Sequence, residues 1–183
     1  MNQDDQIIMA CDDNGAFSGE YIPKEVGHTG QGKRHLAIAV LLYNDQGKVL
    51  LQQRKHRVFD DVWDFTGATH PLHLADHDED FEEATQRCLE REYNIPRKTV
   101  QLKNLSTFNY FAAYKLGICE NEHCAMLIGE YDGSFEMNSE VAYSIKWMDK
   151  KEFLTDLEAN PRKYSPWAIA GLKLLKDHGF FNR

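Results

Sequence analysis

The stretch WDFTGATHP (residues 63–71), followed after a short linker by EDFEEATQRCLERE (residues 79–92), decides the fold. The second part is rich in good helix formers and Asp78 can cap it, so it predicts a helix over residues 79–92. Asn94-Ile95-Pro96 would end that helix, because proline cannot continue it. The first part is rich in turn residues and predicts a loop. Together they bring carboxylates, a histidine and a glycine close in sequence, as a metal-assisted site requires.

Composition bounds the class of protein. The chain has 183 residues, of which 42% are hydrophobic and 27% charged, and this indicates one globular domain over residues 1–183. No run approaches the roughly 18 apolar residues of a membrane span, and the polar N-terminus is unlike a signal peptide. We therefore expect a cytoplasmic protein without membrane contact. The four cysteines form no CxxC pair, so reduced thiols are expected.

The charge balance also bears on partners. The formal net charge is -8, which argues against a general nucleic-acid binder because phosphate contacts dominate that affinity. An acidic protein can still bind an anionic small molecule when a divalent metal ion balances the charge.

Hydrophobic periodicity predicts strands on both sides of the central stretch. The continuous apolar run at 36–43 is interpreted as a buried central strand, and residues 48–54 as its hairpin partner. Two helices should close the chain, the second with Ser165 as N-cap and Gly179 as a stop. This order predicts an α/β (α+β) fold with mixed β-sheets sandwiched by helices. The other expected strands are 6–10, 16–22, 100–110, 120–131 and 141–148, and the closing helices are 149–159 and 166–178.

Three histidines and two glutamates stand out as possible metal ligands. His28 and His35 flank a glycine-rich loop, and His70 precedes a proline. Glu120 and Glu122 alternate along a predicted strand, so their carboxylates lie on one face. This ligand set suits Mn²⁺, Zn²⁺ or Mg²⁺. Spacing alone leaves solvated loop histidines as the better explanation.

The acidic helix resembles a degenerate Nudix box. The usual box has a glycine and a glutamate, then Arg-Glu-x-x-Glu-Glu-x-Gly. The departures, Cys88, Arg91 and Asn94, remove two of the carboxylates that Nudix hydrolases use to hold catalytic metal. The matching residues are Glu79, Arg87, Leu89, Glu92 and Ile95.

From about Lys24 to the C-terminal helix, the chain resembles the type I isopentenyl-diphosphate isomerases, a Nudix-fold family whose own box is similarly eroded. The resemblance rests on motifs in separate segments, which strengthens the expected Nudix fold. These are His28 and His35 in the context His-Thr…Arg-His-Leu-Ala, Trp63 with His70-Pro71, Tyr110, Glu120-Asn121-Glu122-x-Cys124, and Ser165-Pro166-Trp167.

The resemblance implies roles for these residues. Glu92 would help to hold a second ion, Mg²⁺, that arrives with the diphosphate. Lys24 and Arg54 would contact diphosphate oxygens, with Lys55 or Arg57 assisting. Trp167 would cover the hydrocarbon tail, and its π face would stabilise a tertiary carbocation. One divalent metal ion would be held by His28, His35, His70, Glu120 and Glu122.

The family's reaction shifts a double bond, converting isopentenyl to dimethylallyl diphosphate, and it needs acid/base groups on opposing faces. Glu122 with Tyr110 fits one face. The other group is a loop cysteine two residues before the His-Pro, and this chain has Ala68 there. A methyl group cannot transfer a proton, and the nearby hydroxyls of Thr66 and Thr69 are weaker bases than a thiolate. The resemblance therefore implies an isomerase-like enzyme with an altered acid/base pair.

Two alternatives remain open. The first is a Nudix hydrolase that cleaves nucleoside or isoprenoid diphosphates with a metal-activated water, for which Glu79, Glu90 and Glu92 would recruit Mg²⁺. The second is a non-catalytic diphosphate-binding protein that kept the pocket and lost the chemistry.

Overall fold

Strand β3 (His35–Tyr43) is the centre of the fold in this computed structural model, which describes residues 6–182. It pairs in parallel with β8 (Cys119–Glu130) along its full length. On its other edge it pairs antiparallel with β6 (Gly67–Thr69). Most residues of β3 are buried, which confirms the predicted central strand.

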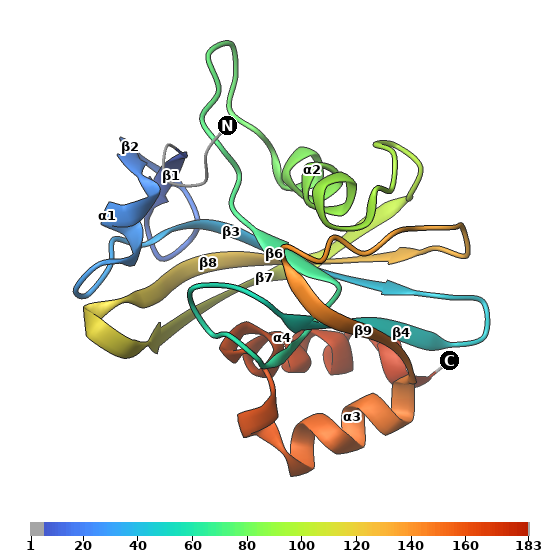
Figure 1. The fold of residues 1–183 in the computed structure, drawn as a ribbon. Coiled ribbons are helices and arrows are strands. Elements are labelled where there is room, and N and C mark those ends of the chain that lie inside the picture. The colour runs from blue at the N-terminus through green and yellow to red at the C-terminus, as the bar shows by residue number, and fades with distance from the viewer. Residues whose placement is uncertain (1–5, 183) are drawn as a thin grey trace.

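Helices cover both faces of the sheet (Figure 1). Alternate residues of β3 point to opposite sides, and each side has its own apolar core. Ala37, Ala39 and Leu41 pack in the core that contains α3 (Lys150–Ala159) and α4 (Pro166–Asp177). The intervening residues pack in the core that contains α2 (Phe81–Tyr93). This arrangement confirms the predicted mixed sheet sandwiched by helices.

Apart from β5, the other strands complete the sheet close to their predicted positions. Strands β1 and β2 form an antiparallel hairpin, and β7 pairs antiparallel with β8. Strand β4 pairs with β5 and with β9. Their bounds are β1 (Ile7–Cys11), β2 (Phe17–Pro23), β4 (Lys48–Arg54), β5 (Trp63–Asp64), β7 (Leu102–Ala113) and β9 (Ala142–Asp149).

Strands β3 and β4 pair as the predicted hairpin only next to the turn that joins them. The two strands share a single register pair, Tyr43 with Val49, and then diverge. Beyond that pair β4 follows β9 antiparallel, while β6 occupies the edge of β3. Sequence periodicity identified both strands but could not show that a later segment, β6, would insert between them.

Thr66 links the diverging strands. Its hydroxyl accepts a hydrogen bond from Leu42 N (2.8 Å) and donates one to Leu50 O (2.7 Å). Its carbonyl accepts from Tyr93 Oη (2.6 Å), which ties α2 to the same point. The side chain is fully buried. Thr66 is therefore a structural residue, because its hydroxyl is hydrogen-bonded to two backbone groups.

Replacing Thr66 with valine should lower the free energy of unfolding by about 2–4 kcal/mol, because two buried backbone groups lose their partner. Urea denaturation measures the loss. Thr155→Val is the matched control, since the Thr155 hydroxyl bonds Lys151 O on the exposed face of α3, and it should change stability by no more than about 0.5 kcal/mol. Equal stability of the two variants would contradict the linking role of Thr66.

Helix α2 begins two residues later than predicted, so the predicted cap at Asp78 is wrong. Asp80 is the N-cap: its side chain accepts from Glu83 N (2.8 Å), while the Glu83 carboxylate accepts from Asp80 N (3.1 Å). Asp78 instead binds His73 and Tyr21. The predicted stop is confirmed, since Asn94 adopts a left-handed conformation (φ 54°) and ends the helix.

Several short elements escaped sequence reasoning. Helix α1 (Lys24–His28) lies in the segment interpreted as a glycine-rich loop, and β5 and β6 lie in the predicted loop at 63–71. Elements of two to five residues are too short to show a period. No described helix is long and apolar enough to cross a membrane. The 3₁₀ helices are η2 (Lys115–Gly117), η3 (Pro161–Lys163) and η4 (Phe180–Asn182).

Candidate metal and diphosphate site

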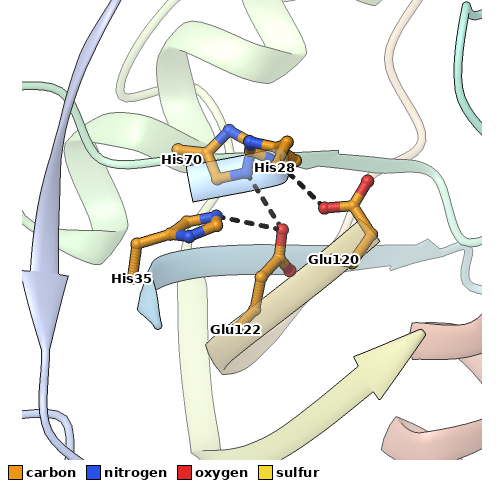
Figure 2. A group of neighbouring side chains, drawn as sticks. All are labelled: His28, His35, His70, Glu120 and Glu122. Atoms are coloured by element: carbon orange, nitrogen blue, oxygen red, sulfur yellow. Dashed lines mark hydrogen bonds and ion pairs between the residues drawn. The ribbon is translucent and has the colours of Figure 1, made fainter. Parts of the chain in front are cut away.

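The three histidines and two glutamates singled out in the sequence converge at one end of β3 and β8 (Figure 2). One ligand atom from each residue can be chosen so that all five lie within 4.8 Å of one another. They come from four segments of the chain: His28 ends α1, His35 opens β3, His70 follows β6, and Glu120 and Glu122 lie on β8.

Strand register explains the convergence. His35 stands directly opposite Glu122 in the parallel β3–β8 pair. On the other edge of β3, Thr69 pairs with Ile38, which carries His70 back toward the start of β3. Helix α1 approaches closely because Gly27 has no side chain: a Cβ there would lie 2.9 Å from His35 Nδ1.

Direct contacts join the imidazoles to the carboxylates. His28 Nε2 lies 2.9 Å from Glu120 Oε2, and His70 Nε2 lies 3.0 Å from Glu122 Oε1. His35 Nε2 is 3.6 Å from that same Glu122 oxygen. The other oxygen of Glu122 accepts a hydrogen bond from Tyr110 Oη at 2.5 Å. Glu122 therefore joins the histidine cluster to a tyrosine hydroxyl.

The histidine rings are oriented for metal binding. His28 Nδ1 donates to Lys24 O (2.7 Å), and His35 Nδ1 donates to Lys33 O (2.8 Å). A carbonyl only accepts, so the neutral ring of each of these two histidines carries its lone pair on Nε2, the atom that faces the cluster. His35 Nε2 and His70 Nδ1 are buried and find no hydrogen-bond partner among residues 6–182. A divalent ion held by three imidazoles and two carboxylates fits these donors.

Charge interactions inside the cluster shift its pKa values. Burial works against ionisation of Glu122, but the neighbouring His35 and His70 rings outweigh it and hold the Glu122 pKa well below its usual value. Burial and the neighbouring Glu122 raise the pKa of Glu120. Burial disfavours the charged form of His28, yet the hydrogen bond to Glu120 raises its pKa. Burial lowers the pKa of His70 well below its usual value, so its ring stays neutral.

A cavity of about 410 Å³ opens beside the cluster, within the size range of small-molecule sites. Its wall combines every cluster residue except His35 with Tyr110 and Trp167, whose rings lie 6.2 Å apart. Positively charged side chains line another part of the wall: Lys24, Arg54, Arg57 and Arg91. The cavity wall thus combines histidine and carboxylate groups, aromatic rings and cationic side chains.

The two predicted diphosphate ligands both border this cavity. Burial and the charge of Arg91 lower the pKa of Lys24. Arg54 donates to the fully buried Asp64 carboxylate at 2.9 Å, and to backbone carbonyls through Nε and Nη2. Its guanidinium lies 4.6 Å from the centre of the Trp167 ring. These bonds hold the Arg54 side chain in the cavity wall and leave two of its five guanidinium N–H groups without a bond among those described.

The two candidate assisting cations in the loop after β4 lie in different places. Lys55 donates to Ser139 O (2.9 Å) and is not part of the cavity wall. Arg57 is part of it, as is His56, for which sequence reasoning found no role. Burial lowers the pKa of His56 to about 3, so the ring is neutral at pH 7.

Trp167 lies in the first turn of α4, where the predicted capping is confirmed. Ser165 caps the helix by accepting from Ala168 N (3.3 Å), and it donates to Asp64 at 2.7 Å. This chain of bonds connects the helix start to the Asp64–Arg54 pair under the cavity. Trp167 is only 3% exposed, and its Nε1 has no hydrogen-bond partner in the described chain.

Ala68 borders the cavity from β6, while Glu122 borders it from β8. Strand β3 runs between these two strands, so the two residues approach the cavity from different sides of β3. Thr69 also reaches the wall. Cys124, two residues after Glu122 on β8, is buried and lies outside the wall.

Comparison with known proteins identifies the family. Residues 33–168 match the NUDIX domain. The chain belongs to the Nudix family. Among the relatives of this Nudix protein is the isopentenyl-diphosphate Delta-isomerase of Clavibacter michiganensis subsp. michiganensis, 28% identical over 177 residues that cover 96% of this chain and 88% of that protein. The isomerase of Paenarthrobacter aurescens is 31% identical over 164 residues, covering 88% and 86%.

Solved structures support the same fold. DR0079 from Deinococcus radiodurans superposes with a TM-score of 0.64 at 15% identity, covering 85% of this chain and 90% of that one. The resemblance to isopentenyl-diphosphate isomerases that the motifs indicated is confirmed by the curated relatives. The Nudix domain and these relatives indicate an enzyme, either an isomerase or a Nudix hydrolase.

The glutamates of the Nudix box pair with arginines and are not part of the five-residue cluster. Both oxygens of Glu79 bind Arg87 at 2.7 Å, and Arg87 also donates to His70 O at 2.8 Å. Glu90 is half-exposed and pairs with Arg97 at 2.8 Å. The Glu79–Arg87 pair holds the loop that carries His70.

Both oxygens of the Glu92 carboxylate also have hydrogen-bond partners. One oxygen accepts from Arg91 Nη2 at 2.5 Å, and the other accepts from Gln52 Nε2 at 3.3 Å. The Glu92 side chain is 1% exposed. With a cysteine at 88 and an arginine at 91, a magnesium ion bound in the box does not fit these contacts.

Proposed function

We propose that this protein is a divalent-metal-dependent enzyme of the isopentenyl-diphosphate isomerase type that has kept one of two acid/base groups. Its substrate is a small isoprenoid diphosphate, and its acid/base unit is the Glu122–Tyr110 pair. The observation that carries the proposal is the 2.5 Å hydrogen bond from Tyr110 to the same carboxylate that contacts His35 and His70.

The Tyr110 hydroxyl holds a proton at one face of the cavity. Burial and the nearby Glu122 charge raise the Tyr110 pKa well above its usual value, so the phenol stays protonated at neutral pH. Proton transfer from this pair to the terminal alkene carbon would give a tertiary cation. The Trp167 ring, which lines the same cavity, would stabilise such a cation by cation–π attraction.

The proposed metal is Mn²⁺ or Zn²⁺, held by the three histidines and two glutamates. Bound there, the ion supplies positive charge that keeps the two neighbouring carboxylates ionised. The cationic wall formed by Lys24, Arg54 and Arg57 would bind the diphosphate through charge-assisted hydrogen bonds.

Ala68 limits what the site can do. Completing the double-bond shift requires a base that removes a proton at C2 on the side opposite Tyr110. No side chain at position 68 can do so here, and the Thr66 hydroxyl is bound to the backbone. The retained pair can return the cation to the starting alkene by taking back a proton from the methyl group. The expected activity is therefore hydrogen exchange with solvent, with little net isomerisation.

The hydrolase alternative has less support. Metal-activated water needs box carboxylates near the diphosphate, whereas Glu79, Glu90 and Glu92 are each paired with an arginine. The proteins named isopentenyl-diphosphate Delta-isomerase also align over most of this chain.

A parallel assay tests the proposal. The metal-loaded protein is incubated with isopentenyl diphosphate and, separately, with nucleoside diphosphates, and released phosphate and pyrophosphate are measured beside exchange of substrate hydrogens. We expect metal-dependent exchange that falls by about 100-fold or more in Tyr110→Phe. Phosphate or pyrophosphate release as the main reaction would instead favour the hydrolase. Tight binding with no chemistry of either kind would favour the non-catalytic protein.

A further inference from the structure

Arg91 borders the cavity at a position where the usual Nudix box has a glutamate. Its Nη2 is anchored by Glu92, and its side chain is 28% exposed. Its Nε is buried and has no hydrogen-bond partner among residues 6–182. The guanidinium is thus fixed on one side and retains unused N–H donors.

The anchor for Arg91 is the same glutamate that would hold a box metal. Glu92 is not part of the cavity wall, whereas Arg91 is. An ion approaching Glu92 from the cavity would have to displace the arginine and break their 2.5 Å contact. Because Gln52 binds the second Glu92 oxygen, both carboxylate oxygens already have a hydrogen-bond partner.

The positive charges around Arg91 favour the binding of an anion. Lys24 and Arg91 are close enough for the arginine charge to disfavour protonation of the lysine, and both also act on His56. Arg57 lies on the same cavity wall. Like charges held together in a partly buried wall repel one another, and a diphosphate placed among them would relieve that repulsion. Guanidinium groups are well suited to phosphate oxygens because they bind through two parallel N–H groups.

We propose that Arg91, held by Glu92, binds the phosphate oxygens that a box-bound Mg²⁺ would otherwise bridge, so that diphosphate binding needs no second metal ion. This inference rests on the proposed function, because it concerns the diphosphate end of the same site. It assigns Glu92 the role of positioning Arg91 rather than that of a metal ligand.

Titration of the full-length protein with inorganic pyrophosphate tests the proposal. The protein is loaded with one equivalent of Mn²⁺ or Zn²⁺, freed of excess metal, and titrated in a calorimeter without and then with added Mg²⁺. We expect binding without Mg²⁺ and no gain when it is added. Native mass spectrometry of the complex should then show one metal ion per chain.

Variants at position 91 sharpen the test. Arg91→Gln should weaken pyrophosphate binding without Mg²⁺ by about 10- to 100-fold, and Mg²⁺ should restore part of it because Glu92 is released. Arg97→Gln is the matched control: it removes the same charge from a half-exposed arginine paired with Glu90 outside the cavity, and it should bind like the wild type. If Arg91→Gln alone folds poorly, Arg91→Gln combined with Glu92→Gln leaves no unpaired buried charge and should show the same loss.

Two results would overturn the inference. One is a wild-type affinity for pyrophosphate that rises 10-fold or more with Mg²⁺, together with a second bound ion. The other is an unchanged affinity in Arg91→Gln. Either result leaves the proposed function standing, whereas a wild-type protein that binds no pyrophosphate under any condition would refute both.

Discussion

Replacing Ala68 with cysteine is expected to raise the rate of isopentenyl-diphosphate isomerisation by about 100-fold or more, the contribution typical of a positioned acid or base. Ala68 borders the cavity from β6, on the other side of β3 from Glu122. A thiol there would supply the missing base. The proton removed at C2 would pass to the cysteine, while the proton added to the alkene comes from the Tyr110 face. Proton NMR of the dimethylallyl product measures the gain.

Ala68→Ser is the matched control for this experiment. Serine adds a hydrogen-bonding group of similar size, but its hydroxyl is a far weaker acid than a thiol and provides almost no anion at neutral pH. We expect its isomerisation rate to stay near that of the wild type. If Ala68→Cys binds metal and substrate yet isomerises no faster than Ala68→Ser, the missing group does not limit the reaction and the proposed function fails on this point.

Replacing Glu122 with glutamine is expected to lower hydrogen exchange by about 1,000-fold or more, since it removes a metal ligand and an acid/base group together. One Glu122 oxygen contacts His70 and His35, and the other accepts from Tyr110. The neutral amide is a poor ligand for a divalent ion and cannot accept a transferred proton. Metal titration followed by thermal unfolding should show that the stabilisation given by bound metal, about 2.7 kcal/mol at 100 times the dissociation constant, is lost.

Glu25→Gln controls for the loss of a negative charge at the cavity. Glu25 borders the same cavity but is exposed and lies outside the five-residue cluster. We expect it to retain metal-dependent stabilisation and exchange within a few-fold of the wild type. A Glu122→Gln variant that binds metal as tightly as Glu25→Gln would show that the cluster is not the metal site.

The sequence predicted which residues gather in the cluster better than it predicted the strand pairing that brings them together. The period-two placement of Glu120 and Glu122 predicted their shared face directly, and the motif resemblance favoured the three histidines as metal ligands over solvated loop residues. Spacing alone argued against metal, because residues 28, 35 and 70 lie in segments that looked like loops. Only the β3–β8 register and the insertion of β6 show why they meet.

Other features depended on contacts that no pattern along the chain could reveal. Arg91 and Glu92 are adjacent in sequence, yet adjacency did not show that one borders the cavity while the other lies buried behind it. Thr66 and Thr69 looked equivalent as hydroxyls near Ala68, but Thr66 is bound to two backbone groups and only Thr69 reaches the cavity wall. Strand β6, three residues long, carries too little periodicity to be predicted.

The central claim is that a metal-supported acid/base pair acts on one face of the substrate while the opposite face has none. The most direct measurement follows wild-type protein with isopentenyl diphosphate in deuterated water by NMR. Solvent deuterium should enter the terminal methylene and methyl positions of isopentenyl diphosphate much faster than dimethylallyl diphosphate forms, and removal of the metal should stop the exchange. Formation of dimethylallyl diphosphate as fast as deuterium enters, or no exchange in metal-loaded protein with bound substrate, would contradict the claim.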